Sequence, residues 1–446
     1  MTDHPPDVRP CAIQWIGTMP SHWSCRRLKH VASVALSSVD KKSHEREEAV
    51  RLCNYVDVYY NERITSELDF MQATATPDEV RRFTLRSGDV LITKDSEAWD
   101  DIAVPAHVPA DLEGVLCGYH LAQVRPHNGL IDGEYLSRSF AARGINDQFR
   151  VVANGITRFG IGKYWIDNAL FLVPPLVEQR TIAAFLDRET ARIDALIEKK
   201  RRQIELLHEK RAALISQAVT KGLDPNAPVK DSGIEWLGEV PAHWQIPPLY
   251  ARFSVELGKM LDEKRITGEH LLPYVRNVDV QWDAVNVTGL PEMDISPDEY
   301  PRYTLKEGDL LVCEGGEVGR TAIWRGELPV CAFQKAIHRI RPLSGRDLPR
   351  FFYYVMRATA FNGVFVAHGN PNTIPHLTAE KLRVYRFAFP PTAEQRAIVD
   401  FLDSETAKID ALVGRIDLSI DRLREYRTAL ISAAVTGKID VRKEVA

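Results

Sequence analysis

The sequence predicts an α+β protein in which two similar globular parts are each followed by a long helix, and three observations support this fold class. The chain repeats itself once at an offset of roughly 220 residues, well above the periods of about 20 to 50 that mark solenoid arrays. Short β-like and helical runs fill most of each copy, and each copy ends in a heptad pattern of apolar residues. With 446 residues the chain is too long for a single compact core, so we expect several domains.

The repeat is clearest in two motifs of the globular parts. IQWIGTMPSHW at 13–23 returns as IEWLGEVPAHW at 234–244, and RFTLRSGDVL at 82–91 returns as RYTLKEGDLL at 302–311. The shorter words VDV and RP also recur in both copies. Agreement of this extent indicates a duplicated domain.

Each globular part is expected to mix short strands with short helices. Gly, Pro and Asp separate apolar runs of strand length, and two aromatic-rich runs have the character of short helices. We predict strands at 89–93, 121–125 and 168–173 in the first copy and at 309–312, 336–340 and 386–389 in the second, with helices at 135–140 and 351–356. The strands are expected to pair non-locally.

The long helices are expected to begin after the Pro-Pro pairs at 174–175 and 390–391, because proline suits the entry of a helix. In the stretches that follow, the words EQR, FLD, ET, IDAL, ALIS and AVT recur without a gap. Apolar spacing near 3.5 residues predicts a coiled coil, with Lys200, Arg211 and Arg427 also on its seams. The residues predicted to pack between the helices are Leu186, Ile193, Ile197, Ile204, Leu207, Leu214, Leu402, Ile409, Val413, Ile420, Leu423 and Leu430.

The two helices keep the same register, which favours antiparallel pairing within the chain. The alternative is that each helix dimerises with another chain. The predicted organisation is a globular domain at 1–173, a central helical spacer at 174–230, a second globular domain at 231–389 and a C-terminal helical spacer at 390–446, with pseudo-two-fold symmetry.

Composition excludes several classes of protein. Hydrophobic residues make up 45% of the chain and charged residues 26%, as in ordinary globular proteins, and no apolar run approaches the roughly 18 residues that span a bilayer. With a net charge of −4, any nucleic-acid contact must come from local clusters of basic residues. The six cysteines form no CxxC pair and the N-terminus lacks the features of a secretory signal, so we expect a cytoplasmic chain with reduced thiols.

The search for catalytic and metal-binding motifs finds none. The sequence contains no Walker loop, no GxGxxG fingerprint, no HExxH motif and no GxSxG elbow. His22 and His243 recur between Pro and Trp, a setting that favours a packed turn over a metal ligand. We therefore expect a non-catalytic chain without a metal.

Basic and amide side chains close to aromatic residues favour a nucleic-acid contact in each half. Such side chains read base edges or hold phosphates, and a solvated surface is the alternative for any single one. Aromatic residues nearby in the sequence include Tyr59 and Tyr60 in the first half and Tyr274, Trp282 and Phe333 in the second. The candidate DNA-binding residues are Lys41, Lys42, Lys94, Trp99, Tyr119, Arg158, Lys163, Lys264, Arg265, Arg276, Arg320, Gln334, Lys335, Asn370, Asn372 and Thr373.

The second copy carries a distinctive series of motifs: GDLLV at 308–312, GGEVGRTA at 315–322, FQKAIHRIRP at 333–342, GNPNTIPHL at 369–377 and FPP at 389–391 leading to EQR. This series resembles the specificity (S) subunit of type I restriction–modification systems, and with the duplicated plan the resemblance covers nearly the whole chain. The first copy departs from it. TKDSEAW at 93–99 replaces the glycine-rich loop, and NGITRF at 154–159 replaces the NPNTIPHL-like segment.

The resemblance implies a non-catalytic DNA sequence-specificity subunit whose two globular domains are target recognition domains, each reading one half of a bipartite double-stranded DNA target. The helices would set the spacer and dock methyltransferase (modification) subunits, expected to be two, which motor–nuclease restriction subunits would join. The resemblance assigns S-adenosylmethionine, ATP and Mg²⁺ to those partner subunits and no cofactor to this chain. The alternative function is a coiled-coil protein-interaction adaptor without DNA binding.

Overall fold

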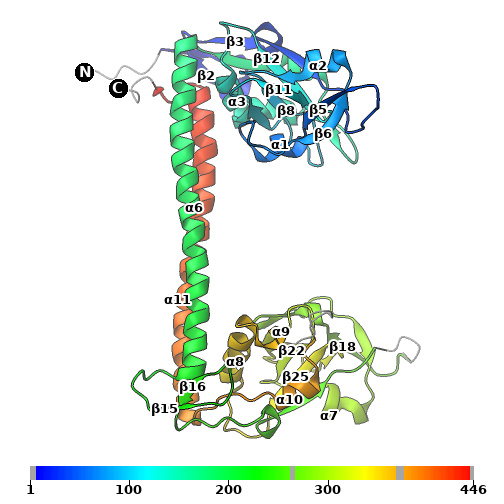
Figure 1. Cartoon of the computed structure of the whole chain (residues 1–446), viewed down its shortest axis with the longest axis vertical. Coiled ribbons are helices and arrows are strands. Elements are labelled where there is room, and N and C mark those ends of the chain that lie inside the picture. The colour runs from blue at the N-terminus through cyan, green and yellow to red at the C-terminus, as the bar shows by residue number, and fades with distance from the viewer. Residues whose placement is uncertain (1–6, 262–266, 368–375, 442–446) are drawn as a thin grey trace. The chain divides into compact units, whose positions relative to one another are not determined.

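The computed structural model describes residues 7–261, 267–367 and 376–441, which fall into two compact units (Figure 1). Unit 1 combines residues 1–200 with 417–446, and unit 2 consists of residues 201–416. Each unit therefore holds one globular part and a portion of both long helices. Within the described residues, no helix is both long enough and apolar enough to cross a membrane.

Two four-stranded sheets form the framework of the globular part of unit 1. The first is antiparallel in the order β10-β8-β12-β4, and the second, in the order β6-β5-β11-β7, contains the parallel pair β5–β11. The strands are β1 (Val8–Pro10), β2 (Thr18–Pro20), β3 (Ser24–Arg27), β4 (Ala32–Leu36), β5 (Glu48–Cys53), β6 (Met71–Ala75), β7 (Thr84–Leu85), β8 (Val90–Thr93), β9 (Asp95–Ser96), β10 (Pro105–His107), β11 (Leu112–Cys117), β12 (Leu121–Pro126), β13 (Phe159–Gly160) and β14 (Leu170–Val173).

Short helices connect and cover these sheets. Side-chain caps define where some of them begin: Thr76 accepts a hydrogen bond from Glu79 N before α2, and Asp132 accepts two from the first turn of α3. The helices are α1 (Tyr55–Tyr60), α2 (Pro77–Phe83), α3 (Gly133–Ala141), α4 (Arg143–Arg150) and α5 (Lys163–Asn168), with 3-10 turns η1 (Gln14–Ile16) and η2 (Leu28–His30).

Unit 2 repeats the sheet topology of unit 1. Its antiparallel sheet has the order β17-β25-β22-β23, and a second sheet, β21-β18-β24, again contains a parallel pair, β18–β24. The strands are β15 (Val229–Asp231), β16 (Glu239–Pro241), β17 (Phe253–Leu257), β18 (Leu271–Val275), β19 (Val280–Gln281), β20 (Ala284–Val285), β21 (Glu292–Asp294), β22 (Leu310–Cys313), β23 (Thr321–Ile323), β24 (Ala332–Phe333) and β25 (Ile337–Pro342). The helices are α7 (Tyr300–Tyr303), α8 (Pro349–Phe361), α9 (Val364–Ala367) and α10 (Ala379–Val384), with 3-10 turns η3 (Leu249–Ala251), η5 (Asn277–Asp279) and η6 (Pro297–Glu299).

One predicted strand does not form. Residues 386–389 make two isolated bridges, Pro248 with Arg386 and Gln245 with Phe389, instead of a continuous strand. The corresponding run in unit 1 is the short strand β14, which pairs along its length with β3. Proline at 247 and 248 explains the difference, because proline has no N–H to donate to a ladder.

The aspartate of the repeated GD motif and the arginine of the repeated RP motif form the same buried ion pair in both units. Arg125 donates from Nε and Nη2 to the two carboxylate oxygens of Asp89, each over 2.8 Å. Arg341 does the same to Asp309 over 2.6 Å. Both aspartates are 1% exposed, so the bidentate guanidinium is what makes their burial tolerable.

The repeated HW and EQR motifs also meet, at the start of each long helix. Glu178 accepts hydrogen bonds from the Trp23 indole over 3.1 Å and from the His22 ring over 2.8 Å. Glu394 accepts the equivalent bonds from Trp244 and His243 over 3.0 and 2.7 Å. Both histidines lie in turns, as the sequence predicts, but their side chains are 40% and 50% exposed and are therefore not packed. Each histidine joins the first strand segments of a unit to a long helix.

The long helices are α6 (Leu176–Lys221) and α11 (Thr392–Val435), and each is continuous through both units (Figure 1). In unit 1 the Arg427 guanidinium pairs with Asp194, and in unit 2 the Arg211 guanidinium pairs with Asp410 over 2.7 Å. These pairs run in opposite chain directions, so the helices pack antiparallel within one chain. Arg211 and Arg427 are tolerated on the seams because each guanidinium reaches an aspartate of the facing helix.

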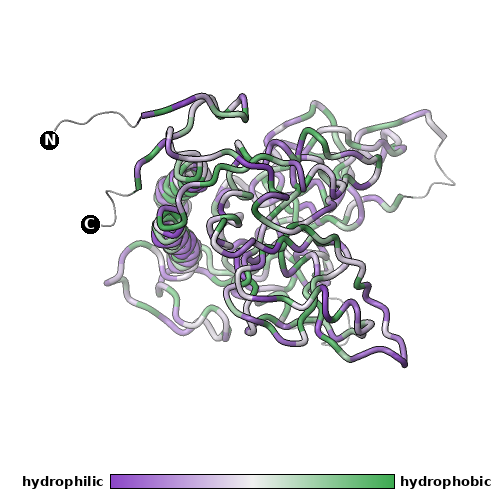
Figure 2. The backbone as a smooth tube through the Cα atoms, turned by 90° about the horizontal axis from the view of Figure 1, so that it is seen from above, coloured by the Kyte–Doolittle hydropathy of each residue, from purple (hydrophilic) through white to green (hydrophobic). Residues whose placement is uncertain are grey.

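The predicted seam residues of the two helices are buried or half-buried. Hydrophilic residues predominate along the backbone of the long helices (Figure 2). In unit 1, Ile431, Ala434 and Val435 of α11 join Leu186 in the core of the globular part. In unit 2, Ile215, Ala218 and Val219 of α6 join Leu402 in the equivalent core. Each globular core is thus completed by residues from both long helices.

Candidate nucleic-acid interface

Three connecting segments converge at the same end of the sheets in unit 1, and the first of them contains helix α1. We call these segments the convergent loops. They follow β5 (residues 54–61), follow β8 (94–101) and precede β12 (118–120). Backbone hydrogen bonds hold them together: Lys94 N donates to His120 O over 3.1 Å, and Gly118 N donates to Cys53 O over 2.9 Å. A side chain at position 118 would meet Cys53 O at 2.7 Å, so glycine is required for this close approach.

The convergent loops of unit 2 use the same backbone connections. They are residues 276–283, 314–320 and 334–336, and they follow β18, follow β22 and precede β25. Glu314 N donates to Ala336 O over 3.0 Å, and Gln334 N donates to Val275 O over 3.0 Å. These bonds align Tyr55 with Asn277, Lys94 with Glu314 and Tyr119 with Lys335. The two units therefore present different side chains on one scaffold.

In unit 1 the carboxylate of Asp95 pairs with two basic side chains near the convergent loops. The Asp95 carboxylate forms an ion pair with the Arg158 guanidinium over 2.9 Å and pairs with the His120 ring over 2.9 Å. The Lys94 ammonium lies 4.3 Å from the centre of the Tyr119 ring and donates to Ser37 O. Burial lowers the pKa of Lys94 from its ordinary value. Half-buried Lys94 and exposed Arg158 thus both have partners within the protein, and their contacts hold the loops in place.

Exposed aromatic rings surround this cluster. Tyr60 is 77% exposed, Trp99 52% and Tyr119 51%. Tyr59 stacks on Tyr55 with ring centres 5.4 Å apart. A hydrogen bond to Asp101 raises the pKa of Tyr59 to about 12. Rings presented in this way can contact thymine methyl groups or stack on unpaired bases.

The remaining candidates of unit 1 differ in their surroundings. Lys41 and Lys42 are exposed in the loop between β4 and β5. Burial raises the pKa of Asp57 in α1, and the charge of Lys41 partly offsets this effect, which places Lys41 close to the first convergent loop. Lys163 is exposed at the start of α5 and pairs with Asp167 over 2.6 Å, outside the convergent loops.

In unit 2 the predicted arginines belong to a polar network. Arg276 donates from Nε and Nη2 to Asp279 over 2.8 and 2.9 Å. Arg320 donates to the backbone and side-chain oxygens of Asn277 over 3.0 and 3.2 Å. Gln334 is half-buried and Lys335 is exposed in the third convergent loop. The candidates Lys264, Arg265, Asn370, Asn372 and Thr373 lie outside the described residues.

Sequence proximity misidentified two aromatic neighbours and missed several polar residues. Tyr274 and Phe333 are buried in strands β18 and β24, so they are not available at the surface. The Trp282 indole donates to Glu317 over 2.6 Å in the second convergent loop. Sequence reasoning did not select Asp95, Asn277 or Glu317. Aligning the two copies of the sequence at their GD and RP motifs could have identified the second and third convergent loops, because these loops lie between the two motifs.

The residues predicted to pack between the helices are buried or half-buried. The buried ones are Leu186, Ile193, Ile197, Leu402, Ile409 and Ile420. The half-buried ones are Ile204, Leu207, Leu214, Val413, Leu423 and Leu430.

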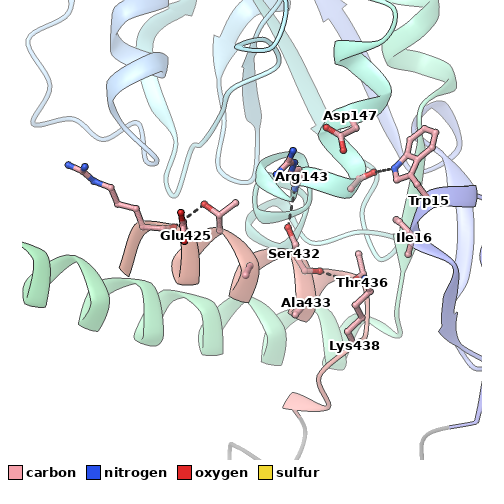
Figure 3. A pocket seen from close by; sticks show the side chains of 13 residues that line it. Trp15, Ile16, Arg143, Asp147, Glu425, Ser432, Ala433, Thr436 and Lys438 are labelled. Carbon is pink, nitrogen blue, oxygen red and sulfur yellow. Dashed lines mark hydrogen bonds between the residues drawn. The ribbon is translucent and has the colours of Figure 1, made fainter. Parts of the chain in front are cut away.

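A groove of about 810 Å³ lies in unit 1 between the last turns of α11, α4 and the Trp15 motif (Figure 3). The Trp15 indole donates to Gly144 O over 2.6 Å, and Arg143 N donates to Ser432 Oγ over 3.1 Å. In unit 2, Asn362 donates to Ser216 over 3.3 Å at the matching position of α6. The ALIS stretch of α6 therefore contacts the globular part of unit 2, and the ALIS stretch of α11 contacts the globular part of unit 1. Among the described residues, no group of three or more His, Cys, Asp or Glu could hold a metal ion.

Comparisons with known proteins agree with this architecture. Residues 255–418 match the family model described as the type I restriction modification DNA specificity domain. A stretch of 137 residues is 29% identical to the type I restriction enzyme EcoBI specificity subunit of Escherichia coli, and it covers 31% of this chain and 28% of that protein. The chain therefore matches less than a third of the length of this curated relative.

Two solved structures share the fold over almost the whole chain. A chain from a study of complex assembly and conformational transition of the type I R-M system has a TM-score of 0.71 at 17% identity, covering 94% of this chain and 99% of that one. The HsdS subunit from Thermoanaerobacter tengcongensis has a TM-score of 0.57 at 17% identity, covering 94% and 98%. The predicted fold class, with two α+β domains and two long helices, and the resemblance stated from the sequence are both confirmed.

Proposed function

We propose that this chain, whose residues 255–418 carry a type I restriction modification DNA specificity domain, is the DNA sequence-specificity subunit of a type I restriction–modification complex. Each globular domain reads one half of a bipartite double-stranded DNA target through its convergent loops. The chain itself is non-catalytic. Methyltransferase subunits, two of them, dock on the long helices, and motor–nuclease restriction subunits join them. S-adenosylmethionine, ATP and Mg²⁺ belong to those partners.

One observation carries this proposal: a single loop scaffold presents different chemistry in the two units. Tyr119 and Lys335, both exposed, occupy equivalent backbone positions. An ammonium donates to base-edge acceptors or to phosphates, whereas an aromatic ring contacts thymine methyl groups. Two domains of this kind suit a target whose halves have different sequences.

The helices give a physical reason for a fixed spacer. Because α6 and α11 are each continuous through both units, they support two reading surfaces on one pair of helices. Half-sites about 34–36 Å apart, one helical turn, present the same face of the duplex. Neither surface needs to bind tightly, because tethering makes the second contact effectively intramolecular.

The test is a domain exchange followed by mapping of methylated bases. Replacing residues 1–173 with those of a relative is expected to change one half-site and leave the other unchanged. Inserting four residues into α6 near Lys200 is expected to lengthen the spacer or abolish recognition. A bipartite methylation motif that persists in the host genome after deletion of this gene would refute the proposal. Absence of salt-dependent binding to any duplex by the assembled complex would favour a protein-interaction adaptor.

A further inference from the structure

Unit 1 contains an ion-pair cluster that links a convergent loop to a long helix. Arg138 of α3 donates to Glu62 over 2.6 Å and to Asp187 of α6 over 2.8 Å. Arg63 pairs with Glu134 of α3 and also with Asp187. Since Glu62 and Arg63 directly follow the first convergent loop, the cluster joins that loop, α3 and α6 through adjacent ion pairs.

Unit 2 makes the equivalent connection with different residues. Arg350 of α8 pairs with Asp283, the last residue of the first convergent loop, over 2.6 Å. The same guanidinium pairs with Asp403 of α11 over 2.7 Å. The Tyr354 hydroxyl donates to Asp403 over 2.5 Å. Here a single arginine bridges the loop and the long helix.

The two clusters occupy the same place in the repeat and join the same three elements. Asp187 and Asp403 are the aspartates of the repeated FLD motif, and Arg138 and Arg350 both lie in a helix that follows the RP motif. In each unit this arginine bridges a carboxylate at or next to the end of the first convergent loop, Glu62 or Asp283, and the long-helix aspartate. The two arginines stand at different positions of their helices, and unit 1 adds a second cation, Arg63. The same connection is therefore made in both units with differently placed residues.

The hydrogen-bond geometry of the clusters and their partial burial allow them to fix the orientation of the loops relative to the helices. The Arg138 side chain is 10% exposed, and those of Asp187, Arg350 and Asp283 are each below 30%, whereas Asp403 is 43% exposed. Charge-assisted hydrogen bonds from a planar guanidinium fix both distance and orientation when water is partly excluded. Burial and a hydrogen bond to Asp187 raise the pKa of Glu134 to about 7, which shows how closely the carboxylates are packed.

We propose that Asp187 and Asp403 are positioning residues that fix the orientation of each set of convergent loops on the long helices, and thereby restrict the spacer length that the protein accepts. This inference rests on the proposed function. The aspartates touch no DNA in this account. They act through Arg138, Arg63 and Arg350, which tie the loops to the helices.

The experiment measures binding of the assembled complex to duplexes with the native half-sites and spacers from two base pairs shorter to two longer. The variants are Asp187→Asn and Asp403→Asn. Glu205→Gln is the matched control, because Glu205 pairs along α6 with Arg202 and both side chains are exposed. We expect binding to the wrong spacers, relative to the native one, to rise about tenfold in the aspartate variants, the size of one lost charge-assisted hydrogen bond.

Half-site preference, measured with single base changes, is expected to stay the same in all variants. The inference would be overturned if both aspartate variants still bound the native spacer in strong preference to shorter and longer ones. It would also be overturned if both variants lost affinity equally at every spacer length. If the wild-type complex binds no duplex, the proposed function fails instead. Tyr354→Phe removes one bond to Asp403 without a cavity, so a broadened profile is expected even if Asp403→Asn does not fold.

Discussion

The exposed lysines at 41 and 42 are expected to contact phosphate, whereas the half-buried Lys94 is expected to hold a loop in place. The first test is the double variant Lys41→Ala/Lys42→Ala in the assembled complex. Both side chains are exposed in the connection between β4 and β5. Each phosphate contact contributes about 0.9 to the slope of log affinity against log salt, so two lost contacts reduce the slope by about 1.8. Between 50 and 200 mM salt, the variant should lose about twelvefold less affinity than the wild type.

The assay is fluorescence anisotropy with a labelled duplex at several salt concentrations. Lys94→Met is the informative comparison, because the Lys94 ammonium donates to Ser37 O and lies over the Tyr119 ring. We expect it to weaken binding without changing the salt slope. Lys199→Ala/Lys210→Ala, which changes two exposed lysines of α6, serves as a control for basic residues away from the loops. An unchanged slope in the Lys41/Lys42 variant, or an equal change in the α6 control, would refute the reasoning.

Two further predictions concern the stability of unit 1. Glu178→Ala removes the acceptor of the Trp23 indole, which is buried, and should lower the free energy of unfolding by about 2 kcal/mol in urea titrations; a change below about 0.5 kcal/mol would contradict this account. Burial lowers the pKa of His107 from 6.5 to about 4, so as pH falls through this range the unfolded state binds the proton first and stability is lost. Between pH 7 and pH 5 we expect a loss of about 2 kcal/mol that is absent in His107→Gln, and equal pH profiles for the two proteins would disprove it.

The long helices were predictable because the heptad pattern is local in the sequence and covers several turns. The sequence places the charged residues Arg211 and Arg427 on the apolar seams, but it does not indicate their partners. Asp410 and Asp194 are identified as those partners only when the two helices are paired. The strands at 90–93, 121–126 and 310–313 formed where predicted. The sheet order did not follow from the sequence, because each sheet joins strands that are far apart in the chain.

The candidate interface was predictable only in part. Exposed Trp99 and Tyr119 were selected for their residue type and do lie at the surface. Tyr274 and Phe333 are of the same type, yet their positions in strands place them in the core. The roles of Asp95 and Asn277 depend on backbone bonds between separate loops, and no single stretch of sequence contains that information.

The assignment of residues 417–441 to unit 1 has a consequence for synthesis of the protein. Ile431, Ala434 and Val435 fill the same core as Phe140 and Leu186, so unit 1 lacks part of its interior until residues 431–435 have been synthesised. The nascent chain must keep that apolar surface exposed while unit 2 is made, a state that invites aggregation or chaperone binding. A stop codon before residue 431 would therefore destabilise the globular part of unit 1, although all of that part has already been made.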